Sequence, residues 1–312
     1  MFGGEGTASV RIAAEITPMG VTDYVPGDWG GVRRVRPGEF HEMLVSGEGA
    51  EEGRERRVLL DVRNHYESRI GYFVDGEGRE AVRPGIRRFA QWPGFVRRWV
   101  AEGDGNGEEE GGNGDGEDKQ VGRKIMAYCT GGIRCEKATR WMLERAQMRP
   151  GDEVYTLEGG IQAYLMWMDE EIRAGRKTVN DSLFKGKNYV FDARGSLGLD
   201  VGHDGGGGER EPMAECHVCG KPEDRLSKCR SRGCHLILVV CEGCEEGDVR
   251  CCGDCGDLDR ESTMEGPRPI CLCEMDREAR LWGEEYFRKR RTKGSRKGAT
   301  EEGIRLEIKT IA

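Results

Sequence analysis

Short apolar segments alternate with helical ones between residues 36 and 175, and this alternation limits the folds open to the chain. The pattern predicts strands over residues 58–62, 125–128 and 153–157, and helices over residues 38–44, 95–101, 136–146 and 161–174. Strands that alternate with helices are typical of an α/β fold, a mostly parallel sheet with helices on both faces. Reactive groups in such sheets gather beyond the carboxyl ends of the strands. A functional site is therefore expected where the predicted strands end.

Composition divides the 312 residues into folded and solvated parts. Only 36% of the residues are hydrophobic against 34% charged, and 49 are glycine, so part of the chain is expected to bury little. Residues 102–118 hold eight acidic residues and no basic one, which predicts a disordered acidic, glycine-rich insert over residues 101–120. The predicted organisation has five parts: residues 1–35, a remnant or end of an N-terminal domain; 36–175, the α/β domain; 176–212, a linker; 213–275, a small cysteine-rich module; and 276–312, a basic tail.

A cysteine follows the second predicted strand directly and opens the loop Cys129-Thr130-Gly131-Gly132-Ile133-Arg134. The glycines allow successive backbone N–H groups to turn inward, and the start of the next helix adds partial positive charge. Together with the charge of Arg134, this anion-binding loop favours the Cys129 thiolate and predicts a nucleophile at neutral pH. A small buried residue at a strand end is the alternative interpretation. Arginine lies five places after the cysteine, rather than six as in phosphatases of this architecture, which suits a group as small as a persulfide sulfur.

Four residues near this loop have structural as well as chemical interpretations. Cys135 is either a resolving thiol for an oxidised or persulfidated Cys129, or a residue packed at the start of the helix. Asp61 and Arg63 lie two residues apart near the end of the first strand, and Glu67 follows them. Side chains in such positions usually hold a neighbouring loop through hydrogen bonds. These three are therefore expected to act as a scaffold.

Paired cysteines dominate the C-terminal third of the chain. The pairs are Cys216 with Cys219, Cys229 with Cys234, Cys241 with Cys244, and Cys252 with Cys255. Such spacings are typical of zinc sites, and eight thiolates predict two structural zinc ions; iron–sulfur ligation and redox-active thiols are the alternatives. We expect a cross-braced arrangement, with the first pair joining the third and the second joining the fourth, and metal binding that supplies much of the folding free energy. His235 and Cys251 stand beside these pairs as alternative ligands, and Cys271 with Cys273 has no evident second pair.

Three segments of the α/β region resemble the signatures of rhodanese domains. They are Leu59-Leu60-Asp61-Val62-Arg63 with Glu67 and Gly71; Tyr128-Cys129-Thr130-Gly131-Gly132-Ile133-Arg134-Cys135-Glu136-Lys137-Ala138; and Leu157-Glu158-Gly159-Gly160-Ile161. The middle segment resembles most the branch that includes the bacterial tRNA wobble-uridine hydroxylases and their eukaryotic rhodanese-domain relatives. That family also carries a cysteine cluster after a Phe-Asp-x-Arg segment, which here is Phe191-Asp192-Ala193-Arg194. The resemblance implies that Cys129 is needed for activity, that tRNA is the substrate and that dioxygen is the co-substrate.

Two other functions fit the same residues. In a sulfurtransferase, Cys129 would take sulfur from thiosulfate or a persulfide donor and pass it to a thiol acceptor or to cyanide, while Arg134 and the loop amides hold the persulfide. The second is a non-catalytic, zinc-stabilised interaction module, although the intact Cys129 and Arg134 speak against it. The sequence leaves hydroxylation and sulfur transfer open.

The remaining features concern partners and compartment. Seven basic residues between Arg288 and Lys297 would suit contact with RNA phosphates, although a solvated tail or a nuclear localisation signal has the same composition. Clustered cysteines without a secretory signal or a long apolar run predict a cytoplasmic protein that does not span a membrane. Members of the resembled family typically begin with a ferredoxin-like domain, and only residues 10–16 resemble its last strand. The chain is therefore expected to start late.

Overall fold

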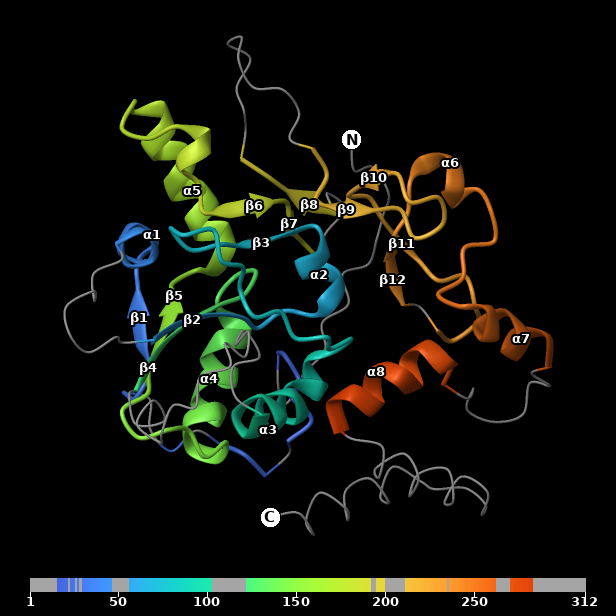
Figure 1. Ribbon diagram of the computed structural model, residues 1–312, viewed down its shortest axis with the longest axis horizontal. Helices are drawn as coiled ribbons and strands as arrows, with labels where there is room; N and C mark the ends of the chain where they lie inside the picture. The colour runs from blue at the N-terminus through green and yellow to red at the C-terminus, as the bar shows by residue number, and fades with distance from the viewer. Residues whose placement is uncertain are drawn as a thin grey trace, which may run out of the picture.

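A four-stranded parallel sheet forms the centre of the larger domain (Figure 1). The computed structural model describes residues 16–21, 23–25, 27, 30–46, 56–102, 122–191, 195–199, 211–234, 236–261 and 270–282. The strand order is β1-β5-β4-β2, and every pairing is parallel. The strands are β1 (Arg33–Val35), β2 (Arg56–Asp61), β4 (Arg123–Tyr128) and β5 (Glu153–Leu157). The three predicted strands are present, and β1 is an additional edge strand.

Helices cover both faces of this sheet, which confirms the predicted α/β class (Figure 1). The side chains of β4 show why, because Ile125 and Ala127 point into one core while Met126 and Tyr128 point into the other. The first core is completed by α3 (Trp92–Glu102) and α4 (Ile133–Arg145), and the second by α1 (Pro37–Val45) and α5 (Gly160–Arg173). A strand that is buried on both faces has no polar side, so its sequence is continuously apolar rather than alternating.

Short elements surround the carboxyl edge of the sheet. The helix α2 (His65–Arg69) follows β2, and the 3-10 turns η1 (Phe89–Gln91) and η2 (Val179–Asp181) lie in connections. Two antiparallel pairs join β3 (Gly71–Phe73) to β6 (Phe184–Gly186) and β7 (Asn188–Tyr189) to β8 (Ser196–Leu197). Part of the segment expected as a linker over residues 176–212 is therefore built onto the larger domain.

The cysteine-rich module consists of two small hairpins and short helices. The strands are β9 (Ala214–Glu215), β10 (Pro222–Glu223), β11 (Leu226–Lys228) and β12 (Ile237–Val239), and the helices are α6 (Glu242–Glu245), α7 (Gly253–Glu261) and α8 (Leu272–Trp282). Its core combines cysteines with a few aliphatic side chains, mainly Leu236, Leu238, Val240 and Val249. The last helix, α8, leaves this core and packs against α3, where Leu281 joins the first core of the larger domain.

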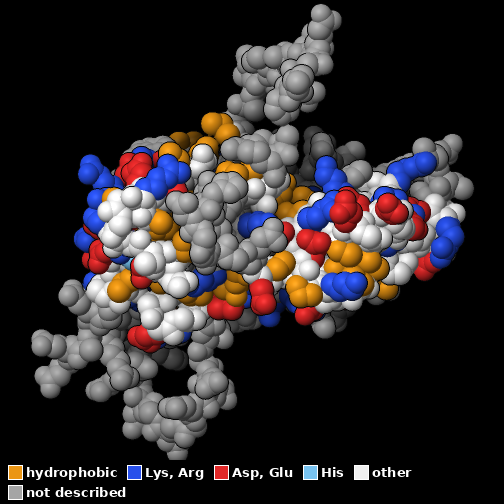
Figure 2. All heavy atoms as spheres, turned by 90° about the horizontal axis from the view of Figure 1, so that it is seen from above, with side chains coloured by type: hydrophobic (Ala, Val, Ile, Leu, Met, Phe, Trp, Pro, Cys, Tyr) orange, Lys and Arg blue, Asp and Glu red, His pale blue; other side chains and the backbone are white. Residues whose placement is uncertain are grey.

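Several expectations lie outside the described residues. These are the acidic insert beyond residue 102, the strand over residues 10–16 apart from its last residue, Asp192 to Arg194, His235, and the basic run over residues 288–297. Among the helices that are described, none is long and apolar enough to cross a membrane. On the face seen in Figure 2, acidic and basic side chains are interspersed over the described surface.

Candidate active site and metal centres

Cys129 directly follows β4, at the carboxyl edge of the sheet where the sequence predicts the reactive group. Its side chain is only 1% exposed, and its Sγ atom accepts a hydrogen bond of 3.1 Å from the Gly132 N–H. Gly132 has a φ of +86°, a left-handed conformation that side chains other than glycine rarely adopt. The backbone N–H groups of Gly131 and Cys135 also donate to the sulfur. The loop is thus an anion-binding cradle of the predicted kind.

The start of α5 closes this loop from the opposite side. The Ile161 N–H donates to the Cys129 carbonyl oxygen at 2.9 Å, and the Gln162 N–H donates to the Thr130 carbonyl oxygen at 3.1 Å. Gly160 has a φ of +63°, and a Cβ atom there would lie 2.4 Å from the Cys129 carbonyl oxygen. Only glycine therefore allows this close approach, which explains the glycine at the first position of α5.

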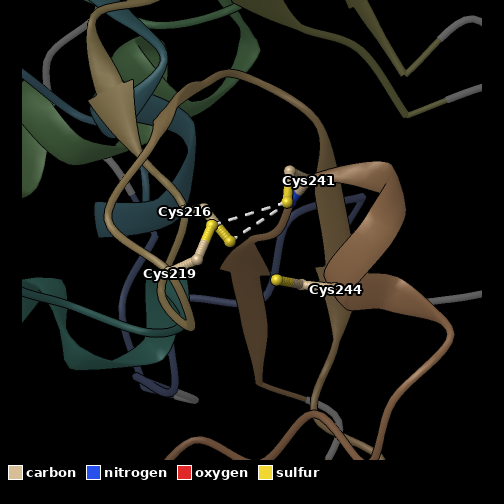
Figure 3. Close-up of side chains that lie close together, drawn as sticks. All are labelled: Cys216, Cys219, Cys241 and Cys244. Carbon is tan, nitrogen blue, oxygen red and sulfur yellow. Dashed lines mark hydrogen bonds between the residues drawn. The ribbon is translucent and has the colours of Figure 1, made fainter.

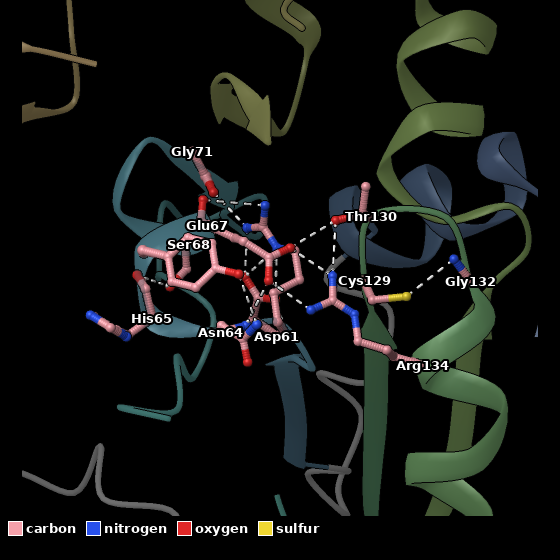
Figure 4. A network of polar contacts seen from close by, with 12 residues as sticks. Asp61, Asn64, His65, Glu67, Ser68, Gly71, Cys129, Thr130, Gly132 and Arg134 are labelled. Atoms are coloured by element: carbon pink, nitrogen blue, oxygen red, sulfur yellow. Dashed lines mark hydrogen bonds and ion pairs between the residues drawn. The ribbon is translucent and has the colours of Figure 1, made fainter. Parts of the chain in front are cut away.

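Arg134 points toward Glu67 and forms the centre of a buried polar network (Figure 4). Its guanidinium donates to both carboxylate oxygens of Glu67, at 2.7 and 2.6 Å, and to the Thr130 hydroxyl at 3.0 Å. Thr130 in turn donates to Glu67 at 3.1 Å, and the carboxylate also accepts the Asn64 N–H. The charge of Arg134 thus acts both on the Cys129 thiolate and on the buried Glu67 carboxylate. Glu67 in turn holds the loop that carries Cys129 through its contacts with Arg134 and Thr130.

Asp61 and Arg63 form a second buried ion pair behind this network. Their shortest contact, Arg63 Nη2 to Asp61 Oδ2, is 2.6 Å, and both side chains are fully buried. The same nitrogen donates to the Gly71 carbonyl oxygen at 2.6 Å, which ties the end of β2 to β3. These contacts hold the end of β2 against β3, and the scaffold role expected for Asp61, Arg63 and Glu67 stays a prediction.

The surroundings of Cys129 set its protonation state. Burial raises the pKa of this thiol. A hydrogen bond from Cys135, the charge of Arg134 and the loop N–H groups lower the pKa by more than burial raises it, so that it falls to about 6. Burial and the neighbouring thiolate raise the pKa of Cys135 well above its ordinary value. Burial also opposes ionisation of Glu67, yet the hydrogen bond and charge of Arg134 bring its pKa below the ordinary value. At neutral pH the site holds a Cys129 thiolate beside a protonated Cys135.

Two exposed apolar side chains flank the buried network. Ile133 is 53% exposed and belongs to the loop itself, while Phe191 is 66% exposed. The Arg134 guanidinium carbon lies 5.6 Å from the centre of the Phe191 ring, and the Tyr189 ring packs edge-on against Phe191 at 4.9 Å. No role was predicted for Phe191 itself from the sequence, where the only signal is its position in the Phe-Asp-x-Arg segment.

The first and third cysteine pairs come together as the cross-braced prediction requires. Cys216, Cys219, Cys241 and Cys244 converge between the two hairpins and α6, and their sulfur atoms all lie within 4.8 Å of one another (Figure 3). Cys219 Sγ lies 3.7 Å from Cys241 Sγ. This separation fits tetrahedral zinc, because Zn–S bonds of about 2.3 Å place two ligands about 3.8 Å apart. It is far longer than a disulfide bond of about 2.05 Å.

The second metal group differs from the prediction at one residue. Cys229, Cys234 and Cys255 lie together, but the fourth sulfur is that of Cys251 rather than Cys252. Cys229 Sγ lies 3.7 Å from Cys255 Sγ, and Cys234 Sγ lies 3.7 Å from Cys251 Sγ. Adjacent residues project in different directions, so only the folded chain determines which of them reaches the site. Cys252 belongs instead to a third group with Cys251, Cys271 and Cys273.

Comparisons with known proteins give one family model and several curated relatives that match this chain. Residues 185–256 match the family model described as Rhodanase C-terminal. A rhodanese-like domain-containing protein 6 of Arabidopsis thaliana is 36% identical over 219 residues, which cover 70% of this chain and 31% of that protein. A tRNA uridine(34) hydroxylase of Leptospira interrogans is 34% identical, with 64% and 42% covered, and one of Chlamydia caviae is 31% identical, with 78% and 61% covered. The chain spans less than two thirds of the length of each of these relatives.

Proposed function

The chain belongs to the rhodanese-like family that includes the tRNA uridine(34) hydroxylases, and from this premise we propose that it hydroxylates the wobble uridine of tRNA with Cys129 as the reactive group. The observation that carries the proposal is the stabilised thiolate. Cys129 has a pKa near 6 and lies in a cradle of backbone N–H groups braced by Arg134 and Glu67. Such a setting is characteristic of a nucleophile rather than of a structural cysteine.

The exposed side chains beside the loop suit a nucleobase. Phe191 offers an aromatic face, and the Arg134 guanidinium lies behind it. Proteins that read single-stranded RNA stack unpaired bases on aromatic rings and arginine planes. The wobble uridine lies in an unpaired anticodon loop, so its ring could stack on Phe191 while its reactive edge approaches the loop.

The thiolate has a defined task in this reaction. It can add to C6 of the uracil ring, which makes C5 nucleophilic toward dioxygen. One oxygen atom stays on C5 as the hydroxyl group, and the other leaves as water after two electrons and two protons come from a thiol reductant. Loss of the C5 proton then expels the Cys129 thiolate and restores the ring. Arg134 and the loop amides stabilise the thiolate before addition and after release.

Sulfur transfer is the second candidate, and the burial of Cys129 favours it. A cysteine residue that is only 1% exposed suits a small reactive group, such as the outer sulfur of a persulfide, better than a bulky one. In this reaction the thiolate would take the outer sulfur of thiosulfate, release sulfite and pass the sulfur to a thiol acceptor. The same loop amides would hold the persulfide anion.

Nucleoside mass spectrometry separates the two candidates. A bacterial strain without wobble-uridine hydroxylation would receive either the wild-type chain or Cys129→Ser, and its tRNA nucleosides would be measured. Hydroxyuridine derivatives that return only with the wild type would support the hydroxylase. No hydroxyuridine from folded, zinc-loaded protein, together with Cys129-dependent thiocyanate formation from thiosulfate and cyanide, would favour sulfur transfer.

The cysteine-rich module would hold structural zinc. Four thiolates at tetrahedral separations form a closed site with no position left for a substrate, which is the structural kind of zinc site. Zinc there would stabilise the fold of a segment whose own apolar core is small.

A further inference from the structure

A third group of four cysteines lies beside the second metal group and shares one residue with it. Cys251, Cys252, Cys271 and Cys273 have their sulfur atoms within 4.8 Å of one another. Cys251 Sγ lies 3.5 Å from Cys273 Sγ and 3.7 Å from Cys271 Sγ, and Cys271 Sγ lies 3.5 Å from Cys273 Sγ. These separations fit the edges of a zinc tetrahedron, about 3.8 Å long. The donors and the geometry are those of a complete structural site.

Counting the thiols supports a metal at this position. Of the 13 cysteines, Cys129 and Cys135 belong to the candidate active site, and each of the other eleven is a member of at least one of the three groups, with Cys251 in two of them. Two closed sites would use eight of those eleven and would leave Cys252, Cys271 and Cys273 clustered without a metal. Free thiols packed so closely oxidise readily, whereas metal-bound thiolates are protected.

Cys251 belongs to the second and third groups at once. Its sulfur lies 3.7 Å from Cys234 in one group and 3.7 Å from Cys271 in the other. A single thiolate can complete both sites only if it bridges two metal ions. We infer that Cys252, Cys271 and Cys273 hold a third zinc ion, and that the Cys251 thiolate bridges this ion to the zinc held by Cys229, Cys234 and Cys255.

The third site would join the module to the larger domain through α8. Cys271 lies just before this helix and Cys273 lies in its first turn, so the metal would fix the helix start. Further along the helix, the buried Glu274 and Glu278 face Arg87 and Arg88 of the larger domain, at 3.5 and 3.6 Å.

The start of α8 lies beyond the segment that matches the Rhodanase C-terminal family model. That segment ends at residue 256, before Cys271 and Cys273.

Cadmium substitution tests the inference without relying on enzymatic activity. Protein loaded with ¹¹³Cd is expected to bind three ions per chain and to show three NMR resonances in the range of thiolate-rich sites. Two of these resonances should be coupled to each other through the shared sulfur of Cys251. Three uncoupled resonances would overturn the bridge, and only two bound ions would overturn the third site.

A matched set of variants locates the third ion. Cys271→Ser combined with Cys273→Ser should lower the zinc content, measured by mass spectrometry of the metal, from three ions to two per chain. It should also speed hydrogen exchange of the α8 amides. Leu272→Ala, which changes the exposed residue between the two ligands, should keep all three ions. Equal zinc content in both variants would contradict the assignment, and the wild-type cadmium spectrum decides the question if the double variant does not fold.

Discussion

Cys129 at the end of β4 and Cys135 in the first turn of α4 are both buried, yet their pKa values move in opposite directions. The reason is a hydrogen bond in which the protonated Cys135 donates to the Cys129 thiolate. Burial alone would raise the pKa of Cys129, so the low value depends on this donor, on Arg134 and on the loop N–H groups. We therefore expect Cys135 to stabilise the Cys129 thiolate, and its role as a resolving thiol stays a prediction.

The pH dependence of alkylation tests that hydrogen bond. In the wild type, iodoacetamide should label Cys129 with half-maximal rate near pH 6, because the thiol is protonated below its pKa. Cys135→Ala should move this midpoint upward by about one to two pH units, since a hydrogen bond to a charged group contributes about 1.5–3 kcal/mol. Cys135→Ser is the matched control, because its hydroxyl group can still donate. Peptide mass spectrometry would follow the labelling of Cys129 alone, and identical profiles for both variants would contradict the proposed donor.

Glu67→Gln tests the contribution of the buried ion pair to stability. The substitution keeps the shape but leaves the Arg134 charge buried without its partner, so the free energy of unfolding should fall by about 3–5 kcal/mol. Because the pKa of Glu67 is lowered in the folded chain, this stabilisation is present at neutral pH and is lost as the pH falls through that lowered value. Urea unfolding at several pH values would measure it. Adding Arg134→Met should recover part of the loss, and a double variant no more stable than Glu67→Gln would argue against the pair.

Phe191→Ala tests the stacking surface. Base–aromatic stacking contributes about 1–3 kcal/mol, so binding of an anticodon stem-loop should weaken by about 5- to 150-fold. Phe191→Tyr keeps the ring and should bind as the wild type does. Fluorescence anisotropy with a labelled stem-loop would provide both affinities. Unchanged binding by Phe191→Ala would remove this residue from the proposed RNA surface.

At the scale of elements, the close packing of α5 on the loop that carries Cys129 makes a sharp prediction. Gly160→Ala would place a methyl group 2.4 Å from the Cys129 carbonyl oxygen and 2.7 Å from the Gly132 nitrogen, so the loop must move. The alkylation rate of Cys129 near neutral pH should fall at least about tenfold, because the displaced N–H groups no longer stabilise the thiolate. Gly175→Ala is the control, since Gly175 has a similar φ of +70° with nothing within 4 Å of its Cβ position. Equal alkylation rates in the two variants would contradict the packing account.

Most of the central elements were predictable because their patterns are local. The predicted helix over residues 161–174 is observed as Gly160–Arg173, and the one over residues 38–44 as Pro37–Val45. The strand β1 was missed because its three residues, Arg33 to Val35, carry two exposed arginines and only one buried side chain. Its place in the sheet comes from pairing with β5, more than a hundred residues away.

At the scale of the whole molecule, the sequence predicted which residues gather but not all of their contacts. The thiolate loop and its N–H groups follow from a continuous motif. The pair between Arg134 and Glu67 joins positions 67 residues apart, so the charge of Arg134 was assigned to the thiolate alone. The packing of distant segments likewise decides that Cys251 rather than Cys252 joins the second metal group. It also brings Cys271 close to Cys251 and Cys252 in the third group.

Removal of zinc should affect the two parts of the molecule differently. The apolar core of the module consists of only a few aliphatic side chains around the cysteines, so chelation should unfold the module and expose its eleven thiols to Ellman's reagent. The α/β domain has two cores of its own and should keep its secondary structure, measured by circular dichroism, and its rapid labelling at Cys129. Restored zinc should reverse the change. Module thiols that stay protected from Ellman's reagent after complete zinc loss would count against a structural role.

The most direct measurement of the central claim is oxygen incorporation by the purified chain. Zinc-loaded protein would be incubated with uridine-34 tRNA, a thiol reductant and ¹⁸O₂, and the nucleosides would be analysed by mass spectrometry. We expect ¹⁸O-labelled hydroxyuridine at the wobble position with the wild type and none with Cys129→Ser. Labelled hydroxyuridine formed equally by Cys129→Ser, or none formed by folded wild-type protein, would contradict a Cys129-dependent hydroxylase.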